Sequence, residues 1–252
     1  MAKPHDGRIA IVTGSGRGIG QEYATALAED GATVVVADLD EQLAAETVEL
    51  ITGKGGRAVA RRVDVGDQES TGSFGEWVRS EFGAAHILVN NAAIYHSMRN
   101  DPQMEVDLGY WRKVFAVNLD GALLMTQAVA PLMVEAGWGR IVNQSSTGAY
   151  SGGGGAYCVS KLALIGLTQG FAKELGQQGI TVNAIAPGLI YTEATMVTVP
   201  EAGRAALLAQ QAVKKEGAPS DLVAALRFFC SDDAGWVSGQ VTIVDGFKTL
   251  RI

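Results

Sequence analysis

A tyrosine and a lysine four residues apart, Tyr157 and Lys161, are the side chains in this sequence best suited to proton transfer. Residues at positions i and i+4 share one face of a helix, so this spacing brings an ammonium group close to a phenol. A free phenol titrates at about pH 10, and a nearby positive charge favours its ionised form. A random pair with this spacing is more often a surface helix turn with a solvated lysine, so the interpretation depends on the residues around it.

A glycine-rich turn at residues 13–20 lies between an apolar, β-branched run and a helical pattern. Glycine lets the backbone approach a ligand without an intervening Cβ, and the N-terminus of the following helix attracts a pyrophosphate. The spacing does not fit the common pattern G-x-G-x-x-G but the wider pattern Gly14-x-x-x-Gly18-x-Gly20. An isolated cluster of this kind can also be a flexible turn that binds nothing.

An aspartate, Asp38, ends the second apolar run, about twenty residues beyond the glycines, where an acid can bind both adenosine ribose hydroxyls. Its charge would repel a 2′-phosphate, so NAD is predicted as the cofactor and NADP is less favoured. Arg17 argues the other way, because a basic side chain in the turn can reach a 2′-phosphate. Asp64 and Val65 follow the third run and are candidates for binding adenine, although an aspartate there is more often a helix cap.

Five motifs in order and with matching spacing resemble those of the short-chain dehydrogenase/reductase family, and the resemblance covers nearly all 252 residues. The family's T-G-x-x-x-G-x-G matches residues 13–20, and its Y-x-x-x-K matches Tyr157 and Lys161. Its N-N-A-G matches residues 90–93 with Ala93 in place of the last glycine, its helix asparagine matches Asn118, and its P-G-x-x-x-T matches residues 187–192. The added methyl of Ala93 is expected to shift the local turn without abolishing cofactor binding.

The resemblance implies a hydride transfer between NAD(H) and a secondary alcohol or its ketone, with Tyr157 as the acid/base. It also implies that Lys161 binds the nicotinamide ribose, that Asn118 holds a water linking Lys161 to solvent, and that a serine hydrogen-bonds the substrate oxygen. Counted from strand residues 141–143, that serine is Ser146; counted back from Tyr157, Ser145 lies nearer. We prefer Ser146, because a strand fixes position more firmly than a glycine-rich loop.

The residues expected to contact the cofactor are Gly14, Arg17, Gly18, Ile19, Gly20, Asp38, Asp64, Val65, Asn91, Ala92, Tyr157, Lys161, Pro187, Gly188, Ile190 and Thr192. No metal site is expected, since the three histidines lack the spacing of metal ligands.

The elements that must position these residues alternate between short β-branched runs and longer helical patterns. Strands are predicted at residues 8–13, 33–38, 57–64, 86–90, 140–145, 181–185 and 240–244, and helices at 19–30, 41–52, 67–82, 108–136, 157–177 and 220–229. This order predicts one α/β domain over residues 1–252, a doubly wound (Rossmann) fold with a parallel seven-stranded sheet and helices on both faces. Residues 189–219, with a short helix at 201–213, are predicted to form the substrate-binding loop.

The pocket is expected between residues 93–98, 148–155 and 189–213, with His96 as a further lining candidate. These stretches are mostly small or apolar and offer no obvious arginine for a carboxylate, which favours an uncharged, partly apolar alcohol or ketone. The net charge of −7 argues against nucleic acid and anionic membranes as partners. The cysteines, Cys158 and Cys230, are expected to be reduced core thiols.

A cytoplasmic location is expected, because no apolar run approaches the roughly 18 residues of a membrane span and the polar start lacks a signal peptide's apolar stretch. The predicted helices at 108–136 and 157–177 carry more apolar surface than one sheet face covers, which favours a dimer or homotetramer. The C-terminal segment 244–252 is expected to dock on a neighbouring subunit.

Three alternatives stay open at this point. The first is a noncatalytic dinucleotide-sensing protein on the same fold, against which the presence of Ser146, Tyr157 and Lys161 argues. The second is a 3-oxoacyl-thioester reductase that uses NADPH. The third is epimerisation or dehydration of a nucleotide sugar. The family members that catalyse these reactions are longer and carry an added C-terminal domain.

Overall fold

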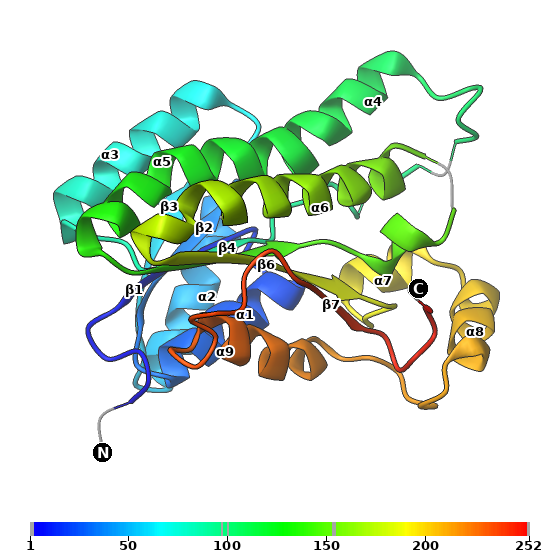
Figure 1. Cartoon of the computed structure of the whole chain (residues 1–252). Helices are drawn as coiled ribbons and strands as arrows, with labels where there is room; N and C mark the ends of the chain where they lie inside the picture. The colour runs from blue at the N-terminus through cyan, green and yellow to red at the C-terminus, as the bar shows by residue number, and fades with distance from the viewer. Residues whose placement is uncertain (1–2, 97, 100, 153–154, 251–252) are drawn as a thin grey trace.

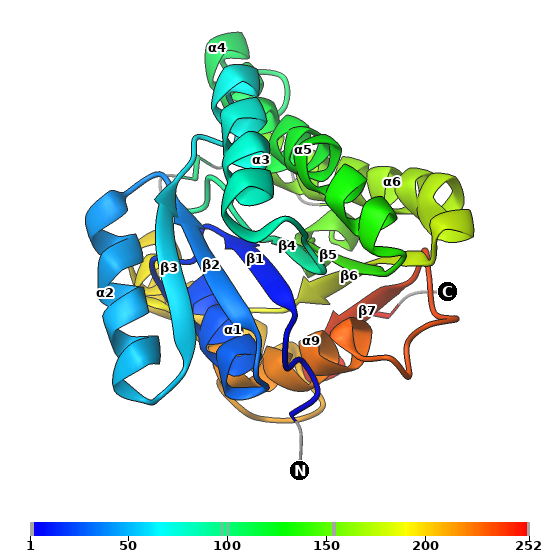
Figure 2. The same cartoon turned by 90° about the vertical axis from the view of Figure 1, so that its left-hand side faces the viewer.

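The computed structural model describes residues 3–96, 98–99, 101–152 and 155–250. Its centre is a seven-stranded sheet in which every pairing is parallel and the strand order is β3-β2-β1-β4-β5-β6-β7. Helices cover both faces of the sheet (Figures 1 and 2), and most strands are therefore continuous apolar runs. The fold predicted from the sequence is confirmed. The strands are β1 (Ile9–Thr13), β2 (Thr33–Asp38), β3 (Arg57–Arg62), β4 (Ile87–Asn90), β5 (Gly139–Gln144), β6 (Ile180–Pro187) and β7 (Val241–Val244).

Two apolar cores lie on the two faces of the sheet, because successive strand residues point in opposite directions. Val12 of β1 packs into the core with α1 (Gly18–Glu29), α2 (Glu41–Gly53) and α9 (Val223–Cys230). Ile11, one residue earlier, packs into the core with α3 (Gln68–Phe82), α5 (Gly121–Ala136) and α6 (Gly155–Leu175). Figure 2 shows these two helix layers on opposite sides of the strands. Because both faces of the sheet are packed in this way, the ends of its strands are held in fixed positions.

The predicted helix at 108–136 has an irregular centre. It begins as α4 (Leu108–Phe115), passes through a π-helical turn at Ala116–Asp120 and continues as α5. Single π-helical turns within α-helices occur frequently at functional sites, and this one contains Asn118. The helical period of the sequence predicts the length of this segment but not its local widening.

The predicted substrate loop contains two helices, α7 (Glu193–Thr198) and α8 (Glu201–Gln210), where the sequence indicated one at 201–213. A residue before proline is driven out of the helical region by a steric clash. Val199 precedes Pro200 and is extended, with φ −110° and ψ 115°, so α7 ends at Thr198. The sequence analysis missed α7 because it is only one and a half turns long.

Other predicted boundaries move by a few residues. β3 ends two residues early, whereas β6 extends to Pro187 because β7 pairs with it as far as that residue. The predicted helix at 220–229 is a short 3₁₀ turn, Pro219–Leu222, followed by α9.

One long helical stretch corrects an expectation from the sequence. Residues Leu108–Ala136 are long and apolar enough to span a membrane by length and composition, with a mean hydropathy of 1.3, contrary to the estimate that no run approached this limit. Half of its most apolar window is buried within the protein. Met125, Val129 and Met133 of α5 pack in the core beneath α3, as in a core helix of a globular fold.

Candidate active site

A cavity of about 760 Å³ opens at the carboxyl ends of the strands, where ligands of doubly wound sheets bind. Segments that follow all seven strands contribute to its wall, so residues far apart in the sequence meet there. Every residue predicted to contact the cofactor lines this cavity, as do Ser145 and Ser146. Asn118 is the exception among the predicted site residues, since it is buried behind the wall.

The glycine turn adopts a backbone that side chains would obstruct. Gly14 and Gly18 have φ values of +61° and +60°, in the left-handed region that favours glycine. A Cβ on Gly14 would lie 2.7 Å from Cα of Ala92, and one on Gly20 would lie 2.2 Å from the carbonyl oxygen of Gly14. The turn thus leads into the N-terminus of α1 through a close backbone approach, the form that suits a pyrophosphate.

Asp38 faces this turn from the end of β2. Its Oδ2 accepts a hydrogen bond from Gly16 N at 2.8 Å, and its Oδ1 accepts one from Asp40 N at 3.1 Å. Asp64 lines the same end of the cavity, and its Oδ1 accepts a hydrogen bond from Gly66 N at 3.0 Å. Arg17 also lines the cavity and is exposed. The residues present fit an adenosine group, with a carboxylate fixed where ribose hydroxyls can donate to it.

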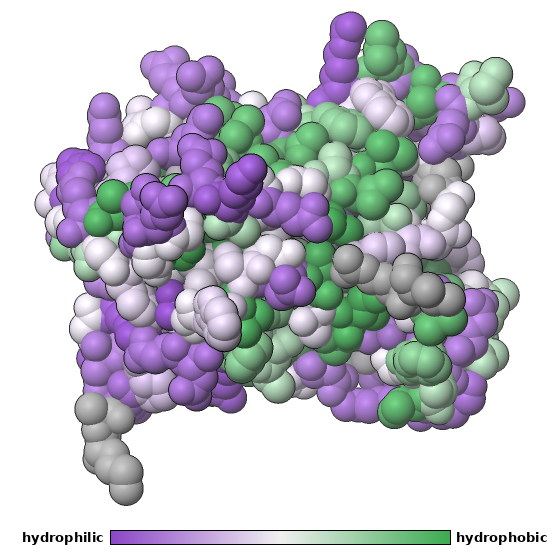
Figure 3. Space-filling model, in the orientation of Figure 1, coloured by the Kyte–Doolittle hydropathy of each residue, from purple (hydrophilic) through white to green (hydrophobic). Residues whose placement is uncertain are grey.

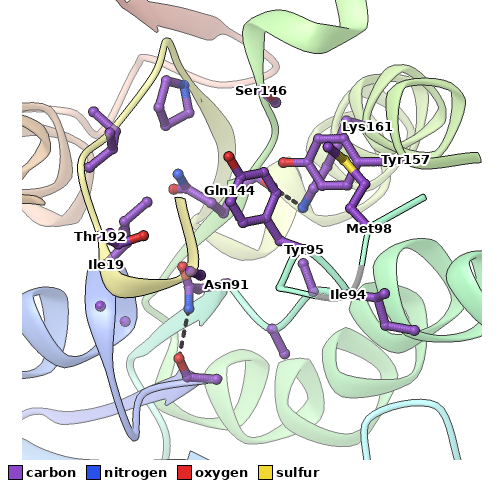
Figure 4. A pocket seen from close by; sticks show the side chains of 18 of the residues that line it. Ile19, Asn91, Ile94, Tyr95, Met98, Gln144, Ser146, Tyr157, Lys161 and Thr192 are labelled. Atoms are coloured by element: carbon purple, nitrogen blue, oxygen red, sulfur yellow. Dashed lines mark hydrogen bonds between the residues drawn. The ribbon is translucent and has the colours of Figure 1, made fainter. Parts of the chain in front are cut away.

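Helix α6 places Tyr157 and Lys161 on the face that borders the cavity (Figure 4). The Lys161 Nζ lies 5.8 Å from the centroid of the Tyr157 ring and donates a hydrogen bond to the carbonyl oxygen of Gln144 at 2.6 Å. Ser146 and Tyr157 form a side-chain hydrogen bond, whereas Ser145 is buried and its Oγ donates to the carbonyl oxygen of Lys161 at 2.8 Å. Ser146, the preferred serine of the sequence analysis, is thus the one that meets the tyrosine.

Burial controls the ionisation of this pair. It raises the pKa of the Tyr157 hydroxyl, and the hydrogen bond with Ser146 partly offsets the rise. Burial also lowers the pKa of Lys161 to about 7, because a charged ammonium loses its hydration. The expectation that Lys161 brings the Tyr157 pKa below that of a free phenol does not describe this structure, in which loss of solvent has the larger effect.

Asn118 connects three elements behind the face of α6 that borders the cavity. Its Oδ1 accepts a hydrogen bond from Ile94 N at 2.7 Å, and its Nδ2 donates to Ser160 Oγ at 3.2 Å. A small cavity of about 10 Å³ is lined by Asn118, Lys161 and Asn90 among others, which is about the volume that one water needs. The π-helical turn therefore brings the asparagine side chain beside the lysine.

The remaining wall is largely apolar and includes Ile94, Tyr95, Met98, Leu189 and Val199. These residues come from two of the three stretches that the sequence analysis assigned to the substrate pocket, 93–98 and 189–213, and Gly148 and Ser151 line the cavity from the third. Within those stretches, Ser97, Gly153 and Gly154 lie outside the described residues.

Tyr95 packs on Tyr157 and contacts residues 189–219, the loop that the sequence analysis predicted to bind the substrate. Its ring centroid lies 5.5 Å from that of Tyr157, and its hydroxyl accepts a hydrogen bond from Thr195 Oγ1 of α7 at 3.4 Å. Thr198, also in α7, donates through Oγ1 to the carbonyl oxygen of His96 at 3.2 Å. These bonds hold the substrate loop against the segment that follows β4.

Two sequence-based assignments on this wall were wrong. His96 is exposed and absent from the described cavity lining, because its backbone, and not its ring, faces α7. Cys158 is half-buried and lines the cavity, while Cys230 is a core thiol as expected. Gln144 was missed, although its place directly before the two serines at the end of a strand was a usable signal.

Comparison with known proteins places the chain in a family. Residues 14–246 match the family model described as Enoyl-(Acyl carrier protein) reductase. An uncharacterized oxidoreductase of Mycobacterium tuberculosis is 44% identical over 98% of this chain and 99% of its own. The (2S)-[(R)-hydroxy(phenyl)methyl]succinyl-CoA dehydrogenase subunit of Thauera aromatica is 39% identical over 96% of this chain and 97% of its own.

A solved structure agrees with these relatives. The gluconate 5-dehydrogenase of Burkholderia cenocepacia, in complex with NADP and tartrate, superimposes with a TM-score of 0.91 at 33% identity, covering 98% of this chain and 97% of its own. The motifs, the strand order and these similarities agree with one another. The chain belongs to the short-chain dehydrogenase/reductase family and is an oxidoreductase.

Proposed function

We propose that the protein is an NAD-dependent alcohol dehydrogenase that transfers hydride between NAD(H) and a secondary alcohol or its ketone. One observation carries this proposal: the Tyr157 hydroxyl lies in the cavity, hydrogen-bonded with Ser146, with Lys161 one helical turn further along α6. A tyrosine and a serine hydroxyl that meet in this way can share one substrate oxygen. A dinucleotide-sensing protein would have no need of this arrangement.

In this mechanism the bound nicotinamide supplies hydride chemistry, and the protein moves the proton. Ser146 donates a hydrogen bond to the substrate oxygen while negative charge develops on it, and Tyr157 gives or takes the proton at that oxygen. Lys161, the small cavity beside it and Asn118 then form a route by which Tyr157 exchanges that proton with solvent. Lys161 also holds the nicotinamide ribose.

We assign NAD as the preferred cofactor because Asp38 carries a fixed negative charge at the adenosine end of the cavity. The glycine turn and α1 hold the pyrophosphate, residues 187–192 hold the nicotinamide end, and Asp64 and Val65 border the adenine. NADP is the alternative, and the gluconate 5-dehydrogenase structure does contain it. The charge difference between the two cofactors makes the assignment testable at Asp38.

The substrate class follows from the wall opposite the nicotinamide end. Ile94, Tyr95, Met98 and Leu189 present apolar surface beside Tyr157, which favours an uncharged secondary alcohol with an apolar ring or chain. The name of the Thauera relative describes a hydroxyl next to a phenyl group. A 3-oxoacyl thioester is the alternative substrate, and residues 189–219 form the loop that closes over either one. We further propose that the enzyme works as a homotetramer in the cytoplasm.

The central experiment is the substitution Tyr157→Phe. It removes one hydroxyl and no packing, so folding and NADH binding should persist while turnover of secondary alcohols falls at least about a hundredfold. Alcohol oxidation should rise with pH and ketone reduction should fall, because oxidation needs the tyrosine deprotonated and reduction needs it protonated. Steady-state rates over a panel of alcohols, diols and hydroxyacyl thioesters, with fluorescence titration of NADH, measure both effects.

Tyr110→Phe is a matched control, since the Tyr110 hydroxyl bonds to Arg99 N at 2.8 Å and Tyr110 is absent from the described cavity lining. Its turnover should stay close to that of the wild type. Substantial turnover in Tyr157→Phe would assign the proton transfer to another group. A product with no net redox change would instead indicate an epimerase or a dehydratase.

A further inference from the structure

A buried glutamine with an unpaired amide nitrogen faces the cofactor cavity. Gln144, the last residue of β5, is 5% exposed and lines the cavity. Its backbone carbonyl receives the hydrogen bond from Lys161 Nζ at 2.6 Å. Its side chain extends to the other face of the sheet, where Tyr23 of α1 donates its hydroxyl proton to Gln144 Oε1 at 2.9 Å.

Tyr23 fixes which end of this amide faces the cavity. Tyr23 is fully buried, and the described residues offer its hydroxyl no hydrogen-bond acceptor other than Gln144 Oε1. With Oε1 engaged, Nε2 is the free end of the amide, and nothing between residues 3 and 250 that the structure describes accepts a hydrogen bond from it. Gln144 borders the cavity, where a bound ligand or water can accept a hydrogen bond from Nε2.

The direction of the amide indicates which part of the cavity it serves. Figure 4 shows the Gln144 side chain pointing away from Lys161, toward the side of the cavity where Ile19 and Thr192 lie. On the proposed function, the nicotinamide ring must lie within reach of the substrate carbon whose oxygen meets Tyr157. A bound nicotinamide ring would therefore lie in the space between Tyr157 and the residues around Gln144.

We propose that Gln144 Nε2 donates a hydrogen bond to the carboxamide oxygen of the bound nicotinamide, and that Tyr23 holds the amide in the orientation this requires. The carboxamide is the polar substituent of that ring, and its oxygen accepts from an N–H donor. Gln144 thereby links the two parts of the reaction. Its backbone carbonyl holds Lys161, which takes part in proton exchange, and its side chain orients the nicotinamide ring, which exchanges the hydride. The inference depends on the proposed function for the location of the ring.

The test is Gln144→Met, which keeps the length and volume of the side chain and removes both polar ends. NADH should bind about tenfold more weakly, the scale of one lost hydrogen bond. The decisive comparison uses thionicotinamide adenine dinucleotide, whose sulfur is a weaker acceptor than oxygen. The wild type should prefer the oxygen cofactor, and Gln144→Met should lose most of that preference.

Two further variants separate this role from packing. Tyr23→Phe leaves Nε2 in place but releases the amide, so it should reduce the same preference to a smaller extent, and it supplies the test if Gln144→Met does not fold. Gln42→Met alters an exposed glutamine of α2, whose side-chain amide donates a hydrogen bond to Glu46 Oε1 at 3.1 Å, and this variant should bind both cofactors as the wild type does.

Equal weakening of both cofactors in Gln144→Met would show that the glutamine only fills space, and unchanged binding would show that it has no contact with the ring. Either result overturns the inference while wild-type turnover still supports the proposed function. A wild type that binds no dinucleotide would overturn both.

Discussion

The chemistry of Tyr157 depends on its surroundings more than on its spacing from Lys161. The i, i+4 spacing correctly predicted that both side chains share a face of α6 and border one cavity. It did not predict that burial raises the pKa of the tyrosine and lowers that of the lysine. Desolvation is set by the tertiary packing of loops from both halves of the chain, which local spacing does not contain.

Lys161 makes the stability of the protein depend on pH. Its pKa is about 7 when folded, against 10.5 for a free lysine, so between these values the unfolded chain binds more protons and stability rises with pH. Below pH 7 the folded lysine carries its charge and the cost of burying it is complete. Lys161→Met removes this cost. The Tm of the variant minus the Tm of the wild type should therefore be most positive at pH 6 and smaller at pH 10.

Thermal unfolding at a series of pH values measures this difference. The unpaired Gln144 carbonyl left by the substitution lowers Tm at every pH and therefore does not affect the trend. A constant difference from pH 6 to pH 10 would contradict a lowered Lys161 pKa.

Asp38 should control the choice between NAD and NADP. Its carboxylate is held by Gly16 N and Asp40 N, so it cannot swing away from a 2′-phosphate without losing both bonds. Asp38→Ser should narrow the preference for NAD by roughly 10- to 100-fold, the scale of hydrogen bonds to a charged group. Values of kcat/KM for the two cofactors measure this. A wild type that already prefers NADP would mean that Arg17 outweighs Asp38.

At the scale of elements, regular periodicity was predictable and local exceptions were not. Strands buried on both faces and amphipathic helices follow from the sequence pattern, and the structure confirms their order. The π-helical turn around Asn118 is held by bonds to Ile94 and Ser160, which lie 24 and 42 residues away. Helix α7 likewise depends on Pro200 and on contacts with the segment after β4. Distant partners of this kind leave no periodic signal.

Helix α7 should cover the bound substrate, and hydrogen bonds from Thr198 should hold it in that position. Its Oγ1 lies 3.4 and 3.2 Å from the carbonyl oxygens of Tyr95 and His96. Thr198→Val keeps the shape and removes these bonds, so KM for the alcohol should rise roughly two- to tenfold with little change in KM for the cofactor. Proteolysis within residues 189–219 should also become faster.

Thr52→Val is the matched control, because Thr52 also bonds to backbone carbonyls but lies in α2, away from the cavity. Both KM values should stay unchanged there. A rise in the KM of the cofactor alone in Thr198→Val would show that α7 closes over the dinucleotide and not over the substrate.

Two groups of exposed apolar side chains, one over α5 and α6 and one on the segments either side of β7, are suited to self-association. Figure 3 shows apolar side chains gathered over α5 and α6, and Leu162 of α6 is 51% exposed. Near the C-terminus, Trp236 is fully exposed, and Phe247 and Leu250 are largely exposed. Two distinct two-fold contacts are what a tetramer with dihedral symmetry needs. Residues 251 and 252 of the predicted C-terminal docking segment lie outside the described residues.

Light scattering at micromolar concentration should therefore give a homotetramer. Leu162→Glu and Trp236→Glu should each leave dimers, because each disrupts one contact and spares the other. Leu50→Glu, on α2, changes a similarly exposed leucine away from both areas and should remain tetrameric. A monomeric wild type would contradict the prediction.

The central position of β1 has a consequence for the growing chain. β1 pairs with β2 on one side, but its other neighbour, β4, follows much later, and the contact between Ile9 and His86 spans 77 residues. While the ribosome has released only the first three strands, Ile11 and Val12 therefore stand at an open, apolar sheet edge that other chains can join. Synthesis of β4 pairs this edge of β1 and brings Asn91 and Tyr95 to the wall of the cavity. It also opens a new edge that β5 must pair, so the nascent protein stays prone to aggregation until the later strands complete both the sheet and the site.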